Sequence, residues 1–241
     1  MISNKKAIIT LLSVFGVLEA TLGVAIQFTS GTLNTVLSYG AIVLAFIFVW
    51  LSFDGSVDFI LTVAALFCTV VADLFLVVLE PMLKLPAMIF FSITQFAYFT
   101  RILLKTKSKP LFITHIAIRS AVSVLILIIT AVVLGANSDA VALISLVYFT
   151  NLALNVIFAF IEFKNNPVIA IGLLLFLLCD FFVGMSMMDG YLTVKEGTLA
   201  YFIAHPGFNA AWVFYVPSQA LIAASVLSQR LRKKHTKNAL G

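Results

Sequence analysis

The sequence is poor in charged residues: Asp, Glu, Lys and Arg make up only 10% of its 241 residues, whereas 62% are hydrophobic. A water-soluble domain carries about 25% charged residues. The chain therefore has too few polar side chains to cover a surface in contact with water. Its mean hydropathy of +1.14 is typical of an α-helical membrane protein with several spans. The apolar runs do not alternate with polar residues, which argues against a transmembrane β-barrel.

Cysteine is scarce as well: Cys68 and Cys179 are the only two, and both lie inside apolar runs. They form neither a disulfide framework nor a metal-binding spacing. The sequence has no Walker loop, no HExxH, no GxSxG and no cysteine–histidine cluster, so no motif calls for a metal or a cofactor. The net charge of +5 comes from basic residues between and after the apolar runs. It indicates orientation in a membrane rather than binding of nucleic acid.

Apolar runs of about 20 residues are long enough to span a membrane as helices. Eight such runs predict an all-α membrane protein with eight transmembrane helices. They are Ala7–Phe28, Leu33–Leu51, Phe59–Leu79, Leu85–Leu104, Ile116–Gly135, Ala140–Ile161, Pro167–Met187 and Asn209–Leu227. The links between them are short, except for Met188–Phe208, which we interpret as an interfacial or re-entrant segment. We expect one integral membrane domain over 1–241, with halves at 1–110 and 111–229 and a basic tail at 230–241.

Basic residues are distributed unequally between the two predicted sides of the membrane. Thirteen of the fifteen fall on the side of the N-terminus, and only Lys84 and Lys195 fall on the other. Because basic loops stay in the cytoplasm, this asymmetry predicts a multi-pass protein of the cell membrane with both termini cytoplasmic. Arg119 is expected to extend from its helix to the cytoplasmic interface.

Two acidic residues interrupt the most apolar runs: Asp73 in LFCTVVADLFLVVL and Asp180 in LLLFLLCDFFVG. A charged carboxylate in hydrocarbon costs several kcal/mol, so each must face the bundle interior, find a partner or stay protonated. Two carboxyl groups close together tend to share one proton, which provides an acid and a base from the same residue type. We therefore predict that Asp73 and Asp180 are functional.

The two halves of the chain look like weak parallel repeats of four helices. Asp180 follows Asp73 by 107 residues, and Gln219 follows Gln95 by 124 residues, with the longer second link accounting for the difference. Both acids lie about two-thirds of the way through their helices and both glutamines about halfway. These four side chains could therefore share one layer.

Further polar residues recur at helical spacing and predict a polar cavity around the acids. We predict that seven residues line it and contact a substrate: Gln95, Tyr98, Tyr148, Asn151, Asn155, Tyr215 and Gln219. For Asn151 and Asn155 a purely structural role, as hydrogen bonds between neighbouring helices, is an equal alternative. Thr62 and Thr69 are expected to bond to their own backbone, and Glu19 is a third acid in an apolar run.

The sequence resembles the YhhN family of eight-helix membrane proteins. The stretches that carry the resemblance are GLLLFLLCDFFVG from Gly172, WVFYVPSQALIAAS from Trp212, VVADLFL around Asp73 and SLVYFTNLALNVIFAF in the predicted sixth helix. The sequence departs from the family where a histidine commonly stands three residues before a tyrosine, since the pair here is Gln95 and Tyr98. The resemblance implies that Asp73 and Asp180 are the aspartates needed for activity.

Animal members of that family are lysoplasmalogenases, so the resemblance implies hydrolysis of the vinyl-ether bond of a lysolipid to a fatty aldehyde and a glycerophospho head group. Two carboxyl groups suit this reaction, because one can protonate carbon while the other stabilises the cation and activates water. The partners would be a lysolipid substrate and the lipids of the membrane. Two alternatives stay open: a proton-coupled transporter, because paired intramembrane acids also relay protons, and a lipid-binding member without catalysis.

Overall fold

The computed structural model describes residues 5–79, 81–104, 109–135 and 138–239. Glu80 and the basic residues Lys105 and Lys107 lie outside these ranges. All regular secondary structure in the described residues is helical. The elements are α1 (Lys5–Gln27), α2 (Gly31–Leu51), α3 (Val57–Asp73), the π-helix η1 (Leu74–Val78), α4 (Lys84–Leu103), α5 (Lys109–Leu134), α6 (Ala140–Ile161), α7 (Pro167–Met187), the 3-10 turn η3 (Met188–Gly190), α8 (Leu199–Ala204) and α9 (Ala210–Ala239).

The observed helices follow the predicted runs closely, and α6 and α7 have the predicted bounds. Three segments differ. The third helix does not continue to Leu79 as an α-helix but changes to a π-helix after Asp73. The long link after α7 contains η3 and the short α8, and the last helix continues through the first part of the basic tail as far as Ala239.

Local sequence signals explain where several helices begin. The side chains of Ser56, Asp139 and Asn166 each accept a hydrogen bond from a backbone N–H in the first turn of α3, α6 and α7, respectively. Pro167 follows directly in α7, where its missing N–H and fixed φ are compatible with a first turn. In the link from α2 to α3, Gly55 has a φ of 68°, a conformation that glycine adopts without steric cost.

Seven helices in the described residues are long and apolar enough to cross a membrane: α1, α2, α3 continued by η1, α5, α6, α7 and α9. The eighth predicted span, α4, is 20 residues long but is not among the seven by composition. It carries polar residues in its middle and Arg101 in its last turn. The structure therefore shows an all-α protein with several membrane-spanning helices, and its seven candidate spans confirm this part of the predicted fold.

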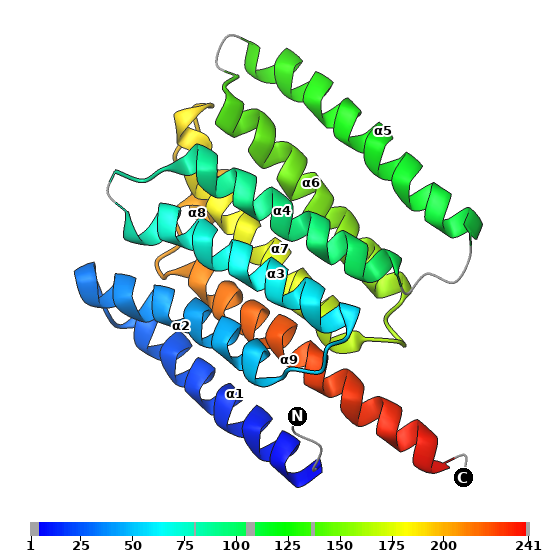
Figure 1. Cartoon of the computed structure of the whole chain (residues 1–241). Coiled ribbons are helices and arrows are strands. Elements are labelled where there is room, and N and C mark those ends of the chain that lie inside the picture. The colour runs from blue at the N-terminus through cyan, green and yellow to red at the C-terminus, as the bar shows by residue number, and fades with distance from the viewer. Residues whose placement is uncertain (1–4, 80, 105–108, 136–137, 240–241) are drawn as a thin grey trace.

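The helices lie side by side in one bundle, with α1 and α5 at opposite edges and α3, α4, α7 and α9 between them (Figure 1). The most extensive contacts join α7 to α9 and α3 to α4. Gly172 allows α7 to approach α9 closely, because a Cβ atom there would lie 2.9 Å from Cγ1 of Ile222 and 3.2 Å from its backbone nitrogen. The π-helix contacts α2 and α4 as well as α3.

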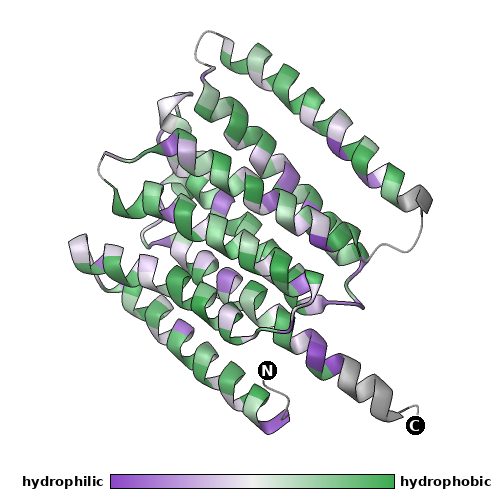
Figure 2. Ribbon diagram, viewed as in Figure 1, coloured by the Kyte–Doolittle hydropathy of each residue, from purple (hydrophilic) through white to green (hydrophobic). Residues whose placement is uncertain are grey.

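The bundle is apolar on the outside and carries its polar residues inside or at its ends. Hydrophobic residues make up most of the ribbon, with hydrophilic residues scattered among them along the helices (Figure 2). Many large hydrophobic side chains are exposed on the outside, whereas polar side chains such as those of Gln95, Arg101 and Asn155 are buried. Only 11% of the apolar window of α5 is buried inside the chain, compared with 56% for α9. A membrane protein is expected to look like this, because lipid rather than water surrounds the outer faces.

Candidate functional site

Asp73 lies at the end of α3, where the α-helix changes to the π-helix η1. Its side chain is 3% exposed, and the hydroxyl of Tyr215, from α9, donates a hydrogen bond of 2.7 Å to its Oδ2. Single π-helical turns interrupt the regular backbone hydrogen bonds and are frequent at functional sites. No sequence signal marks this turn, because its residues Leu74–Val78 are all apolar.

Asp180 lies on α7 and has a similar environment. The hydroxyl of Tyr148, from α6, donates a short hydrogen bond to its Oδ2. Tyr148 and Tyr215 are each 5% exposed. Each of the two acids therefore has a buried tyrosine from another helix as its hydrogen-bond partner, and neither forms an ion pair within the described residues.

The structure brings the two acid–tyrosine pairs together. The two pairs are joined through aromatic side chains of α4 and α7. A chain of ring contacts connects their tyrosines: Tyr148 packs on Phe91 with 5.7 Å between ring centroids, Phe91 on Phe176 with 6.1 Å, and Phe176 on Tyr215 with 5.5 Å. We call Asp73, Asp180, Tyr148 and Tyr215 the acid layer.

A second polar cluster lies between α4, α5 and α6. Arg119 donates to Oδ1 of Asn155 at 2.7 Å and to Oδ1 of Asn151 at 3.3 Å. The Asn155 side chain in turn donates to Oε1 of Gln95 at 2.9 Å. We call Arg119, Asn151, Asn155 and Gln95 the arginine cluster. The prediction that Arg119 extends to the cytoplasmic interface is wrong, because its side chain is only 6% exposed and bonds to these amides inside the bundle.

The seven residues predicted to contact substrate are therefore divided between two places. Tyr148 and Tyr215 belong to the acid layer, whereas Gln95, Asn151 and Asn155 belong to the arginine cluster. Tyr98 and Gln219 are buried but hydrogen-bond to neither group in the described part of the chain.

The remaining polar residues singled out in the sequence are also inside the bundle. Thr62 and Thr69 donate to backbone oxygens one turn back, as expected. Glu19 is 3% exposed, and neither of its carboxyl oxygens has a hydrogen-bond partner among the described residues. Within the described residues, no group of three or more His, Cys, Asp or Glu is placed to hold a metal ion.

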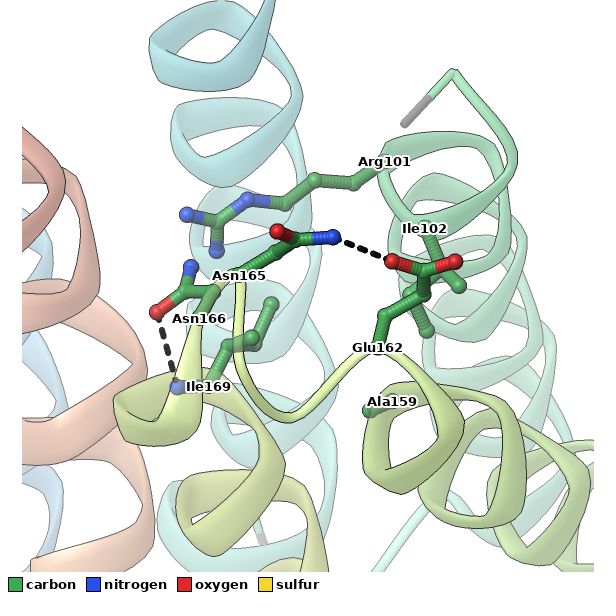
Figure 3. Close-up of a pocket in the computed structure, with 7 residues that line it drawn as sticks. All are labelled: Arg101, Ile102, Ala159, Glu162, Asn165, Asn166 and Ile169. Atoms are coloured by element: carbon green, nitrogen blue, oxygen red, sulfur yellow. Dashed lines mark hydrogen bonds between the residues drawn. The ribbon is translucent and has the colours of Figure 1, made fainter. Parts of the chain in front are cut away.

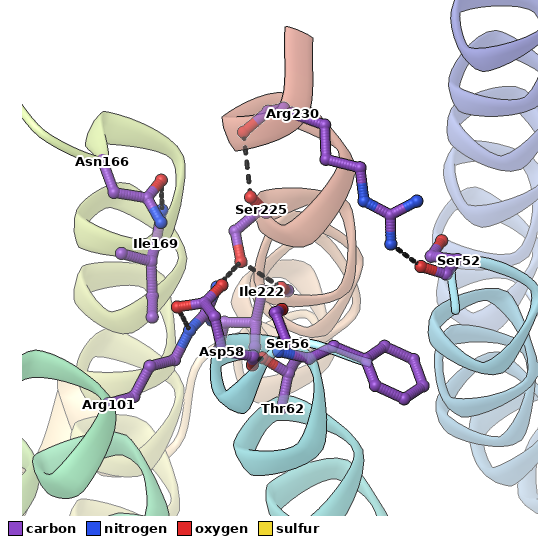
Figure 4. A network of polar contacts seen from close by, with 12 residues as sticks. Ser52, Ser56, Asp58, Thr62, Arg101, Asn166, Ile169, Ile222, Ser225 and Arg230 are labelled. Atoms are coloured by element: carbon purple, nitrogen blue, oxygen red, sulfur yellow. Dashed lines mark hydrogen bonds and ion pairs between the residues drawn. The ribbon is translucent and has the colours of Figure 1, made fainter. Parts of the chain in front are cut away.

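One end of the bundle is held by ion pairs. Arg101, from α4, donates to both carboxylate oxygens of Asp58 at 2.7 and 2.8 Å and to Oγ of Ser225 in α9 at 2.8 Å (Figure 4). Arg230 pairs with Asp54 at 2.9 Å and also donates to the backbone oxygen of Ser52. The pKa of Asp54 is below its ordinary value. Partial burial opposes this shift, but hydrogen bonds from Ser56 and the charge of Arg230 outweigh it.

A small cavity of about 20 Å³ lies beside Arg101 at this end, between α4, α6 and the start of α7 (Figure 3). Glu162, Asn165 and Asn166 also line it. Its volume suits a single water molecule rather than a substrate.

A larger surface hollow of about 730 Å³ lies at the other end. It is lined by Thr29, Asn34 and Thr35 from the region of the α1–α2 turn, by Val77 and Val78 of the π-helix, and by Asn209 before α9. Val77, which lines this hollow, is only four residues after Asp73 in the sequence.

The fold and these polar groups define a multi-pass α-helical membrane protein with one buried and one partly buried aspartate, Asp73 and Asp180, between its helices. The model of the YhhN family matches residues 33–226, which is most of the chain. The protein therefore belongs to the YhhN family, as the resemblance of its sequence predicted. Comparison with curated proteins and with solved structures gives no match.

Proposed function

We propose that this protein is a membrane-embedded hydrolase that cleaves the vinyl-ether bond of lysoplasmalogen-type lysolipids. The observation that carries this proposal is the acid layer, in which Asp73 and Asp180 each accept a hydrogen bond from a buried tyrosine and ring contacts connect the two tyrosines. Membership of the YhhN family supports it. The apolar interior suits the long alkyl chain of such a lipid.

The chemistry uses one protonated and one ionised carboxyl group. The protonated Asp gives its proton to the outer carbon of the vinyl ether, and the electron pair of the double bond forms the new C–H bond. The ionised Asp stabilises the resulting oxocarbenium ion and takes a proton from the water that attacks it. The hemiacetal then breaks its C–O bond to release a fatty aldehyde, and the glycerol oxygen receives a proton. Because two interacting carboxyl groups titrate as a pair, we assign the roles of acid and base to the pair and not to one residue.

The tyrosines would hold the two carboxyl groups in place without neutralising them. A phenol hydroxyl donates one hydrogen bond and carries no charge, so it orients the carboxyl group but leaves the proton transferable. Water would reach Asp73 from the hollow at the end of the π-helix, whose lining includes Val77 and Val78.

We also propose that α4 is the eighth span and that the two halves of the bundle are repeats. In support, α4 packs between α3 and α6 inside the bundle. Asp73 in α3 and Asp180 in α7 each accept a hydrogen bond from a tyrosine of another helix, as matching positions in two repeats would. We propose that the protein lies in the plasma membrane with both termini in the cytoplasm, and the excess of basic residues on the N-terminal side supports this orientation.

A lipid-binding member without catalysis is the second candidate, and a specific observation favours it. Gln95 stands where family members commonly have a histidine, and it belongs to the arginine cluster rather than to the acid layer. If the histidine acts in the reaction, its replacement by a neutral amide removes a proton donor. The acid layer itself does not depend on Gln95.

The test is aldehyde release by the purified protein from a lysoplasmalogen and from the corresponding saturated 1-alkyl lysolipid. We expect aldehyde from the vinyl ether only, because a saturated ether has no double bond to protonate. Binding of both lipids without release of aldehyde would favour the lipid-binding alternative. Proton movement driven by substrate in proteoliposomes, without cleavage, would favour the transporter and contradict the hydrolase.

A further inference from the structure

Arg119 is a buried cation without an acidic partner among the described residues. Its side chain is 6% exposed, and it takes no part in the described ion pairs of Arg101 with Asp58 and of Arg230 with Asp54. Its hydrogen-bond acceptors are the neutral side chains of Asn151 and Asn155 and the backbone oxygen of Asn151. Its guanidinium carbon also lies 4.2 Å from the ring centroid of Phe99 and 5.5 Å from that of Phe158.

Burying an unpaired charge is costly, and amide oxygens and aromatic rings offset only part of that cost. In a membrane-spanning helix such a cation marks a binding site or an ion pathway more often than a structural contact. The arrangement differs from that of Arg101, whose charge is balanced by Asp58. The arginine cluster therefore carries an excess positive charge that an anion would neutralise.

Unused hydrogen-bonding groups lie in and next to this cluster. Among the described residues, Nε of Arg119 and Nε2 of Gln95 have no acceptor, although both side chains are at least nine-tenths buried. Both belong to one network, because the Asn155 amide bonds to Arg119 on one side and to Gln95 on the other. His115, one turn before Arg119, is 1% exposed, stacks on Phe158 and has no partner for Nδ1.

The position of the cluster relative to the acid layer suggests which anion it takes. Both groups are anchored on α6: Tyr148 bonds to Asp180, and Asn151 and Asn155 bond to Arg119. Asn151 and Asn155 follow Tyr148 by three and seven residues, so they lie about 4.5 and 10.5 Å further along the axis of α6. In a lysolipid, the ether bond and the phosphate are separated by the three carbons of glycerol, which is a comparable distance.

We propose that the arginine cluster binds the phosphate of the lysolipid head group and so places the ether bond at Asp73 and Asp180. Arg119 supplies the charge, and the N–H groups of Arg119 and Gln95 that have no acceptor donate to phosphate oxygens. This inference rests on the proposed function for the identity of the lipid. It gives Gln95, which stands where family members commonly have a histidine, a role in binding the head group.

The test is binding of two lipids that cannot be cleaved as vinyl ethers and differ only in the head group. Palmitoyl lysophosphatidylcholine carries the phosphate, whereas monopalmitoylglycerol lacks it, and native mass spectrometry of the detergent-solubilised protein measures both. We expect the wild-type protein to bind the phospholipid about tenfold more tightly or better. Arg119→Gln should remove this preference and leave the affinity for monopalmitoylglycerol unchanged.

Two further variants make the result specific. Arg119→Lys keeps the charge but loses the planar donor geometry, so it should retain part of the preference. Arg232→Gln removes an exposed arginine that bonds to the backbone oxygens of Lys164 and Asn165, and it should retain all of it. The Lys variant also preserves the test if the Gln variant does not fold.

Three outcomes would overturn the proposal. If Arg119→Gln weakens the binding of both lipids equally, Arg119 supports the fold only. If the variant still prefers the phospholipid as the wild type does, the phosphate binds elsewhere. Inorganic phosphate that competes as strongly as the lysolipid would assign the site to a free anion. Because none of these assays requires turnover, a protein that keeps the preference but releases no aldehyde would refute the hydrolase and leave the phosphate site standing.

Discussion

Aspartates occupy two regions of this bundle and have different partners in each. At one end, Asp58 and Asp54 pair with Arg101 and Arg230 at 2.7 and 2.9 Å. In the acid layer, Asp73 and Asp180 receive hydrogen bonds from tyrosines and from no cation in the described residues. The cation in the first arrangement favours the charged form of the carboxylate, whereas in the second we propose that a proton can move between the two acids.

The comparison suggests a physical difference between a structural acid and one that we propose to be reactive. An arginine that binds both oxygens of a carboxylate neutralises its charge and links two helices, as Arg101 links α4 to the start of α3. A tyrosine holds the carboxyl group but leaves its protonation to be set by the neighbouring acid. The predictions below change one region while leaving the other intact.

The largest effect is expected in the acid layer. Asp73→Asn and Asp180→Asn should each reduce aldehyde release by about a thousandfold or more, since an amide can neither give nor take the proton. Thermal unfolding in detergent should change little, because asparagine keeps the shape of the side chain. Asp139→Asn is the matched control: Asp139 is an exposed helix cap, and asparagine caps equally well. Activity that survives in either acid-layer variant would contradict the mechanism.

The second effect is on stability at the ion-paired end. Asp58→Asn leaves the guanidinium of Arg101, which is 1% exposed, without its charge partner. We expect a loss of about 3–5 kcal/mol in the free energy of unfolding, as is usual when one member of a buried pair is removed. Thermal and denaturant unfolding would measure it. Stability equal to that of the wild type would mean that the pair does not hold the bundle end.

A smaller effect is expected from the tyrosines. Tyr215→Phe and Tyr148→Phe each remove a single hydrogen bond to an acid and leave the ring contacts with Phe176 and Phe91 in place. Aldehyde release should fall by about tenfold, in line with one lost hydrogen bond to a charged group. The initial rate at saturating lipid measures it. A loss as large as that of the Asp variants would make the tyrosine a proton donor in its own right.

The smallest effect concerns Asp54, whose lowered pKa reports its bonds to Ser56 and Arg230. A carboxyl group with a depressed folded-state pKa stabilises the protein above its unfolded pKa, here 3.8, and this stability is lost as the pH falls through the folded value. Because the pair is partly exposed, we expect about 1 kcal/mol or less. The stabilities of the wild type and Asp54→Asn should differ at pH 6, and the difference should shrink as the pH falls below 3.8. A constant difference between them would contradict this account.

Much of the fold follows from the sequence because spanning helices are long, apolar and separated by turn residues. The bounds of α6 and α7 could be predicted since Asp139 and Asn166 cap their first turns and polar links follow them. The π-helix could not be predicted, because Leu74–Val78 reads as an ordinary continuation of α3. The position of α4 inside the bundle could not be predicted either, because it depends on packing against α3 and α6. The polar residues of α4 lower its hydropathy, so it is not among the seven candidate spans.

The residues of the site were easier to find than their partners. An acid in an apolar run needs a partner or a proton, so Asp73 and Asp180 can be recognised from the sequence. Tyr148 and Tyr215 can be recognised as polar residues at helical spacing in other predicted helices. Which tyrosine meets which acid depends on helix packing that one sequence does not encode locally. Arg119 was misplaced for the same reason: snorkelling is the usual behaviour of an arginine near a helix end, but Asn151 and Asn155 on α6 provide acceptors inside the bundle.

The central claim, that Asp73 and Asp180 form one unit with a shared proton, is tested most directly by infrared difference spectroscopy of the purified protein across a pH titration. We predict a carbonyl band of a protonated carboxyl group in the wild type that is changed by Asp73→Asn and by Asp180→Asn alike, and is unaffected by Asp139→Asn. A band that responds to only one of the two acid-layer variants, or to neither, would contradict the account.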